Sequence, residues 1–428
     1  MSHDSRILAG PRRLMAVWAL TALFAGAPMR VQAADGAPSS PASVTALAAR
    51  VDFQGDRTRL LFELSDPVRA ETFAVAAPDR IIVDLPEVAF RLDPSIGREG
   101  AFGNGAGALP SLVKSYRFGQ FAPGHSRVVI ELSRPAKVLR AESVARAEGA
   151  RLEIDLAPMD AAKFADAAAE HARAVARAAA PPRVMESPPE SGKTDQPLVV
   201  IDPGHGGVDV GAAGKHGELE KAIVFEFAKT LKAAIEARGR LRVLLTRGDD
   251  VFIALGDRVR FARTHGASLF LSIHADTLGS PNVEGATVYT AASRASDAEA
   301  ARIARQENFA DQAAGLEEKA DAEEVGDILF DLTRRETRAL ARDFSTSLVS
   351  KWRDAGSLNK NPSRSASFVV LKAHDVPSAL LELGYLSSEK DLANLTSPEW
   401  RERAAGVTAD AIAAYFSARD NASRASAK

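Results

Sequence analysis

Hydrophobic and polar positions alternate along the first third of the chain. Over residues 44–158 apolar side chains recur at about every second position, and Asp-Pro, Gly and Arg-Pro turns interrupt them. This alternation is typical of short antiparallel strands with one buried face. The block also repeats itself, since residues 58–68 match residues 126–136. Two copies of one strand unit predict two facing sheets around one core, a small all-β sandwich.

After residue 197 the pattern changes to alternating strands and helices. Residues 198–201 are continuously apolar, as in a strand buried on both faces, and residues 221–238 carry apolar side chains at helical spacing. Further strands are expected at 241–246, 269–273, 285–290, 368–372 and 379–383, and further helices at 255–265 and 407–416. This alternation predicts an α/β catalytic domain over residues 198–418, with a mostly parallel sheet and helices on both faces.

Two segments lie outside these domains. One is expected to direct export of the chain, and the other is expected to link the two domains. Residues 1–34 contain basic residues, an apolar run at 14–26 and a small-residue exit at 31–33, which predicts a cleavable secretory signal. The pair Arg12-Arg13 is compatible with a twin-arginine route or with the basic part of a Sec signal. Residues 159–197 form an Ala/Pro-rich linker whose first part could be helical. We therefore expect a mature chain outside the cytoplasm, with no integral membrane span.

Composition limits the chemistry that this chain can perform. The 428 residues include no cysteine, which excludes disulfides, thiolate metal sites and a cysteine nucleophile. The formal net charge of −2 provides no general attraction to nucleic acid. Any metal must therefore be held by histidines and carboxylates.

Four such residues are expected at one edge of the predicted sheet. His205, His274 and Glu382 each lie at the end of a predicted strand, and Glu220 begins the helix after the first strand. In open α/β sheets, ligands bind beyond the carboxyl ends of the strands. Four residues that are remote in sequence are thus predicted to converge.

The chemistry of these residue types fits a hydrolytic metal site. Two neutral imidazoles and one carboxylate, from His205, Glu220 and His274, can hold Zn²⁺ and leave a fourth position open. Glu382 can then act as the acid and base for proton transfer. Glu218 is an alternative to Glu220, which could instead serve only as a helix-start carboxylate. Paired burial is the alternative role for Glu382.

These residues lie in four ordered motifs. The motifs are Asp202-Pro-Gly-His-Gly-Gly207, Gly217-Glu-Leu-Glu-Lys221, Ser272-Ile-His-Ala-Asp276 and Leu380-Leu-Glu-Leu-Gly-Tyr-Leu-Ser387. They resemble the successive motifs of the zinc-dependent N-acetylmuramoyl-L-alanine amidases, over residues 198–416. The resemblance implies that His205, Glu220 and His274 are the zinc ligands and that Glu382 is the catalytic glutamate. It also implies hydrolysis of the amide between N-acetylmuramic acid and the L-alanine of the stem peptide.

The duplicated N-terminal block is similar to the AMIN domain that accompanies some of these amidases. The similarity rests on the strand pattern and on the Asp-Pro and Arg-Pro turns. It implies that residues 44–158 bind peptidoglycan and direct the enzyme to the division septum. The expected location is the periplasm, and the expected role is septal wall splitting during daughter-cell separation.

An acidic insertion interrupts the strand–helix pattern at residues 295–332. It holds eleven acidic and three basic residues, and it carries an apolar stripe at Val325, Ile328, Leu329 and Leu332. Amidases of the cell-separation type have an insertion here that blocks the zinc until a LytM-domain activator displaces it. We therefore hypothesise that Glu307, or one of Glu323 and Glu324, occupies the open zinc position at rest. The alternative is a solvated acidic helix covering one edge of the fold.

Two other functions remain compatible with the residues. The same tripod could serve a different metal-dependent hydrolase, such as a carbohydrate deacetylase. A wall-binding protein with a decayed enzyme domain is a third possibility, although the complete set of four site residues argues against it. Release of stem peptides or of acetate would separate the two enzymes.

Overall fold

The computed structural model describes residues 44–100, 111–178, 196–280, 282–316, 328–354 and 356–426. The expected signal at residues 1–34 and the second half of the linker lie outside the described residues. Within these ranges, every helix is too short or too polar to cross a bilayer.

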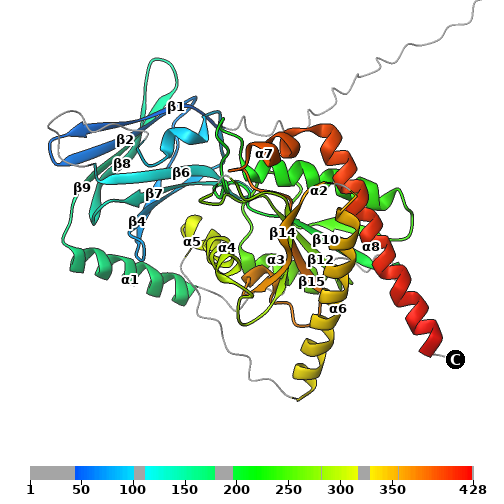
Figure 1. Ribbon diagram of the computed structural model, residues 1–428. Helices are drawn as coiled ribbons and strands as arrows, with labels where there is room; N and C mark the ends of the chain where they lie inside the picture. Colours follow the sequence, from blue (N-terminus) through cyan, green and yellow to red (C-terminus); the bar gives the residue numbers. More distant parts are fainter. Residues whose placement is uncertain are drawn as a thin grey trace, which may run out of the picture. The chain divides into compact units, whose positions relative to one another are not determined.

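The N-terminal part of the chain forms two sheets (Figure 1). The first has the strand order β5-β1-β2-β9-β8, and the second has the order β3-β4-β7-β6. The strands are β1 (Val44–Gln54), β2 (Arg57–Leu64), β3 (Glu71–Val75), β4 (Arg80–Pro86), β5 (Val88–Phe90), β6 (Val113–Ala122), β7 (His125–Leu132), β8 (Ala136–Ala145) and β9 (Ala150–Pro158). All neighbouring strands pair antiparallel except β1 and β5.

Alternating side chains of the two sheets share one core. Leu60 and Phe62 of β2 and Ile81 and Val83 of β4 belong to the same buried cluster. Burying every second residue removes about 25 cal/mol of unfavourable hydration per Å² of apolar surface, which explains the period of two in the sequence. The predicted all-β sandwich is confirmed.

A helix follows the sandwich directly. Helix α1 (Ala161–Ala178) occupies the first part of the expected linker. Its His171 ring stacks on Phe73 of β3, with ring centroids 3.8 Å apart. The helical half of the linker is therefore packed on the sandwich.

The C-terminal part of the chain is built on a six-stranded central sheet with the order β11-β10-β12-β15-β13-β14. Its strands are β10 (Leu198–Pro203), β11 (Arg242–Leu245), β12 (Leu269–His274), β13 (Ala286–Ala291), β14 (Leu358–Ala366) and β15 (Ser378–Glu382). The first four strands in this order are parallel, whereas β13 is antiparallel to β15 and parallel to β14. The predicted mostly parallel sheet is confirmed.

Helices cover both faces of this sheet. They are α2 (Glu220–Glu236), α3 (Leu255–Thr264), α4 (Ala298–Asn308), α5 (Ala310–Ala313), α6 (Ile328–Trp352), α7 (Glu389–Thr396) and α8 (Pro398–Ser426). On β10, Val199 packs in the core formed with α2, α6 and α8, whereas Val200 packs in the core formed with α3 and α4. Because successive side chains point to opposite faces, a strand between two helical layers must be apolar throughout.

One predicted strand is wrong. Residues 368–372 contain the short 3-10 helix η2 (Val369–Leu371), and the strand in this region is β14, at Leu358–Ala366. Val370 and Leu371 are apolar because they are buried under the sheet, and a short apolar run does not distinguish a strand from another buried segment. Strand β14 was missed because it is a polar edge strand that contains Pro362.

Candidate metal centre

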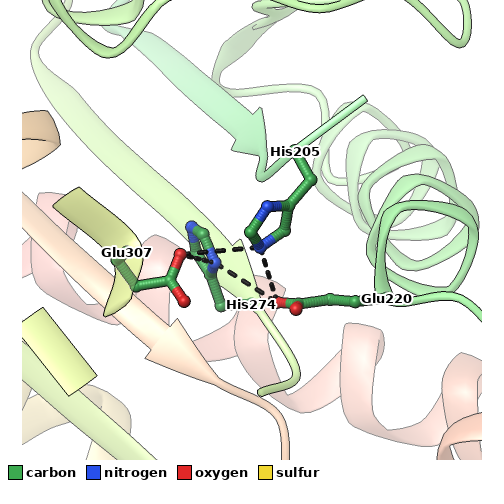
Figure 2. Close-up of side chains that lie close together, drawn as sticks. All are labelled: His205, Glu220, His274 and Glu307. Atoms are coloured by element: carbon green, nitrogen blue, oxygen red, sulfur yellow. Dashed lines mark ion pairs between the residues drawn. The ribbon is translucent and has the colours of Figure 1, made fainter. Parts of the chain in front are cut away.

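Four buried side chains converge at one edge of the central sheet. One ligand atom each from His205, Glu220, His274 and Glu307 can be chosen so that all four atoms lie within 4.8 Å of one another (Figure 2). His205 follows β10, His274 ends β12, Glu220 begins α2, and Glu307 lies near the end of α4. The structure thus brings together the three sequence-predicted ligands and one of the three acidic residues suggested for the open position.

The register of the sheet explains this convergence. Pro203 at the end of β10 lies opposite Ile273 of β12, and His274 lies opposite Glu382 at the end of β15. The three parallel strands therefore end at the same level, and the side chains at and just beyond their carboxyl ends share one rim.

Glu218, the alternative ligand, lies outside the cluster. Its Oε2 accepts a hydrogen bond from the backbone N–H of His216 at 3.0 Å. Glu220 instead accepts from the backbone N–H groups of Ala212 and Ala275, at 2.8 and 2.9 Å. These two bonds fix the carboxylate of Glu220 between the loop after β10 and the end of β12.

His205 has an unusual backbone conformation for a residue with a side chain. Its φ of +58° lies in the left-handed region. The carbonyl of His205 accepts from Arg258 Nη2 at 2.9 Å, and the ring Nδ1 lies 2.8 Å from Asp209 Oδ2. With Nδ1–H donating to Asp209, the lone pair of Nε2 is left for a metal.

Two glycines let the backbone approach the metal-facing side chains closely. A Cβ atom at Gly204 would lie 2.5 Å from Cε1 of the His274 ring. At Gly211, where φ is +67°, it would lie 2.7 Å from both Glu220 Oε2 and His205 Cδ2. Each glycine therefore supplies space that the cluster needs.

The interatomic distances fit a tetrahedral cation site. Glu220 Oε1 lies 3.0 Å from His205 Nε2 and 3.3 Å from His274 Nδ1. Glu307 Oε2 lies 3.5 Å and 2.8 Å from the same two nitrogens (Figure 2). Zinc bonds of about 2.0 Å in a tetrahedron imply ligand separations of about 3.3 Å.

The hydrogen bonding of the two imidazoles also favours a cation site. His205 Nε2 and His274 Nδ1 are buried and make no hydrogen bond of acceptable geometry to any described residue, although both lie within ion-pair distance of carboxylates. Buried polar atoms are rarely left without a partner. Two nitrogens and two carboxylate oxygens facing one point are the donor set expected around Zn²⁺.

The electrostatics of the site favour positive charge. Burial by itself lowers the pKa of His205, but the carboxylates of Glu220, Asp209 and Glu307 outweigh burial and raise this pKa well above its usual value. The buried Asp276 and Glu382 add further carboxyl groups to the same region. A divalent cation would compensate this concentration of acidic groups.

Glu382 lies beside the cluster rather than in it. It is the last residue of β15 and is fully buried. Its Oε2 accepts from the backbone N–H of Asp276 at 3.2 Å, and its Oε1 has no hydrogen-bond partner among the described residues. Burial, reinforced by the charges of Asp276 and Glu307, raises the pKa of Glu382 well above its usual value. Such a carboxyl group is suited to exchange a proton with a reactant.

Sequence reasoning missed the residues that support the loop after β10. Asp209 orients His205, and the buried Asp202 accepts hydrogen bonds from Arg258 Nη1, Thr246 Oγ1 and Ser272 Oγ. The available signal was the position of Asp209, four residues after a ligand histidine, because metal-bound imidazoles usually donate their other N–H to a carboxylate or carbonyl.

The residues suggested for regulation are only partly described. Glu307 is 4% exposed and is the acidic residue found at the fourth position of the cluster. Glu323, Glu324 and Val325 lie outside the described residues. Ile328 and Leu329 begin α6, and the side chain of Leu332 on the same helix is exposed, with a relative accessible surface of 55%.

Comparisons with known proteins agree with this site. Residues 199–414 match the model of the N-acetylmuramoyl-L-alanine amidase family, and residues 50–156 match the model of the AMIN domain. The first match covers the six strands, apart from Leu198, and all four residues of the cluster.

Similar proteins extend along most of the chain. The N-acetylmuramoyl-L-alanine amidase AmiC of Escherichia coli O6:H1 is 32% identical over 384 residues, which cover 86% of this chain and 89% of the relative. AmiC of Neisseria meningitidis serogroup B is 30% identical with the same coverage. Among solved structures, amidase AmiC2 of Nostoc punctiforme covers 53% of this chain and 99% of its own, with 29% identity and a TM-score of 0.38.

Proposed function

Because the chain belongs to the zinc-dependent N-acetylmuramoyl-L-alanine amidases, with an N-terminal AMIN domain, we propose that it splits septal peptidoglycan during daughter-cell separation. The bond cleaved is the amide between N-acetylmuramic acid and the L-alanine of the stem peptide. The enzyme acts in the periplasm, after export directed by residues 1–34 through the twin-arginine or Sec route. Supporting this proposal are the site chemistry and the similarity to the two AmiC proteins along most of the chain.

In this proposal, His205, Glu220 and His274 are the zinc ligands. The observation that carries the assignment is the convergence of their ligand atoms, with two imidazole nitrogens that make no hydrogen bond of acceptable geometry to any described residue. Zn²⁺ held there supplies Lewis acidity to a carbonyl oxygen or water at the fourth ligand position. The protein contributes the fixed direction of each ligand, through Asp209 for His205 and through two backbone N–H groups for Glu220.

Glu382 performs the proton transfers. As a carboxylate it accepts a proton from the water that attacks the scissile carbonyl. The carbon–nitrogen bond then breaks, and the same carboxyl group returns the proton to the departing nitrogen of L-alanine. The products are the carboxylate of the muramoyl lactyl group and a stem peptide with a free amino group.

Glu307 keeps the enzyme inactive at rest. Its Oε2, 2.8 Å from His274 Nδ1 and 3.5 Å from His205 Nε2, takes the position that the substrate carbonyl needs. A LytM-domain activator displaces the insertion at residues 295–332 and so frees this position. The AMIN domain binds peptidoglycan and places the enzyme at the septum.

Digestion of purified sacculi tests the proposed reaction. The mature protein with its insertion removed, loaded with zinc, should release intact stem peptides with a free L-alanine amino terminus, detected by mass spectrometry. Release of acetate with no stem peptides would show instead that the site serves a carbohydrate deacetylase.

A further inference from the structure

We propose that the AMIN domain itself holds the blocking segment, defined as residues 307–316, over the metal site. This inference rests on the proposed role of Glu307. It adds that a second domain of the chain takes part in holding this residue over the metal site. The domain would then be both a wall-binding module and part of the inhibitory mechanism. The contacts that carry the inference come from strands β4 and β7 of the second sheet.

Two buried arginines of this sheet bind the backbone of the blocking segment. Arg80 on β4 is 3% exposed, and its Nη1 donates to the carbonyl of Gln312. Arg127 on β7 is 5% exposed, and its Nη1 donates to the carbonyl of Ala314 at 3.1 Å. Hydrogen bonds from a charged donor are stronger than neutral ones, and these two lie at the end of α5.

The side chain of Arg127 is also held in place by residues of its own domain. Its Nε and Nη2 donate to both carboxylate oxygens of Asp84, at 2.6 and 2.8 Å. Its guanidinium also lies 3.5 Å from the centroid of the Phe121 ring. A side chain held on two sides loses little rotamer entropy when it binds a carbonyl, so the bond to Ala314 retains most of its strength.

Apolar contacts reinforce these hydrogen bonds. Ile82 and Val129, from the outer face of the second sheet, form a buried cluster with Ala314. Gly315 has a φ of +79°, and a Cβ atom there would collide with the Ile82 side chain. The left-handed backbone at Gly315 and the close approach of the Ile82 side chain therefore both favour glycine at this point.

The other side of the segment is attached to the amidase domain. Asn308 Nδ2 donates to the carbonyl of Ser367, and its Oδ1 accepts from the N–H of Val369, both at 2.8 Å. Asp311 Oδ1 accepts from the N–H of Leu255 at 2.9 Å. Glu307 is thus held through contacts with both domains, and loosening either set should release it more often.

The AMIN domain also contacts the loop that carries His205. The carbonyl of Gln120 accepts from the N–H of Val208 at 3.2 Å. The Phe121 ring stacks on Phe252 with centroids 5.7 Å apart. Any displacement of the domain would consequently disturb both the metal-binding loop and the blocking segment.

The variant Arg80→Met tests the inference, because it keeps the apolar stem and removes the donor to Gln312. We expect basal activity on labelled sacculi, without activator, to rise about tenfold, since the population of the open state depends on the lost bond. The matched control is Arg59→Met, which removes an ion pair with Asp155 in the first sheet, and its basal activity should stay at the wild-type level.

Hydrogen exchange separates this inference from the proposed function. Amides of residues 309–316 should exchange faster in Arg80→Met and at the wild-type rate in Arg59→Met, whatever reaction the site catalyses. Gly315→Ala should also speed this exchange, whereas Gly124→Ala, at a left-handed glycine with open space around it, should not. Wild-type exchange in folded Arg80→Met and Gly315→Ala would overturn the inference, even if the wild-type protein proves to be an amidase.

Discussion

His205 directs its side chain into the metal cluster from a backbone in a disfavoured conformation, with a φ of +58°. A non-glycine residue in the left-handed region costs on the order of 1–3 kcal/mol. The bond from Arg258 to the His205 carbonyl and the bond between Nδ1 and Asp209 hold the residue there. These bonds therefore keep His205 in the strained conformation, in which Nε2 faces the other residues of the cluster.

Replacing Glu382 with glutamine should separate catalysis from metal binding. Glu382→Gln keeps the size of the side chain but removes the proton acceptor, so turnover of sacculi should fall at least ~100-fold. Zinc content, measured by mass spectrometry of the purified protein, should remain at one ion per chain because residue 382 lies outside the ligand cluster. Glu389→Gln, at an exposed position on α7, is the control and should keep full activity. Activity retained in Glu382→Gln would refute its proposed role.

Residue chemistry made much of this site predictable. His205 and His274 stood out because histidine at the end of a predicted strand reaches the ligand-binding edge of an α/β sheet. Asp209 was not predicted, because its partnership with His205 depends on how a glycine-rich loop folds. The choice between Glu218 and Glu220 was also decided only in three dimensions, where the carboxylate of Glu220 reaches both imidazoles.

Helix α4 sets the position of the Glu307 carboxylate. Asp297 caps the helix by accepting from the N–H of Ala300 at 2.9 Å, and Ile303 and Ala304 bury one face under the sheet. Glu307 follows on the next turn of that buried face, which explains why it points inward although it is charged. The helix thus fixes the Glu307 side chain beside the other three residues of the cluster.

Removing the charge of Glu307 should activate the enzyme. Glu307→Gln weakens the competition for the fourth position, so we expect basal amidase activity to rise about tenfold, in line with the loss of one charge-assisted interaction. Dye release from labelled sacculi measures this directly. Glu299 on the same helix pairs with Arg364 at 3.2 Å, away from the cluster, and Glu299→Gln should leave basal activity unchanged. Unchanged activity of a folded, zinc-loaded Glu307→Gln variant would count against the block.

Helices and strands were easier to predict where burial requires a distinctive pattern of apolar residues. Strands β10 and β12, between two helical layers, are almost wholly apolar and were found. Strand β14 at the edge of the sheet is largely polar and pairs with one neighbouring strand, β13, and it was missed. The acidic character of residues 295–332 indicated an insertion, but its hydrogen bonds with the AMIN domain are accepted by backbone carbonyls, which leave no trace in the sequence.

On the scale of the whole molecule, the metal site connects the central sheet with helices on both of its faces. His274 comes from the sheet, His205 from the loop directly after β10, Glu220 from α2 on one face and Glu307 from α4 on the other. An ion bound there stabilises the folded state by its binding free energy, because the unfolded chain cannot gather these ligands. Stability should therefore depend on metal as well as on packing.

Chelation should lower the midpoint of thermal unfolding. At an ion concentration 100 times the dissociation constant, binding contributes about 2.7 kcal/mol, and its loss corresponds to a shift of about 5–10 °C for a domain of this size. Differential scanning calorimetry with and without EDTA measures the shift, and added zinc should reverse it. His274→Ala should lose both zinc and activity, and its midpoint should not respond to EDTA. An equal midpoint for the wild-type protein with and without EDTA would contradict a structural contribution from the metal.

The order of the functional residues along the chain has a consequence for biosynthesis. Glu307 precedes Glu382, the last functional residue of the site. With the roles proposed above, a polypeptide made from its amino terminus carries the blocking carboxylate before it carries the proton-transfer group. A product truncated anywhere between these two positions would lack Glu382 and, with it, the proposed means of hydrolysing the wall. Incomplete synthesis should then yield inert fragments rather than unregulated lytic ones.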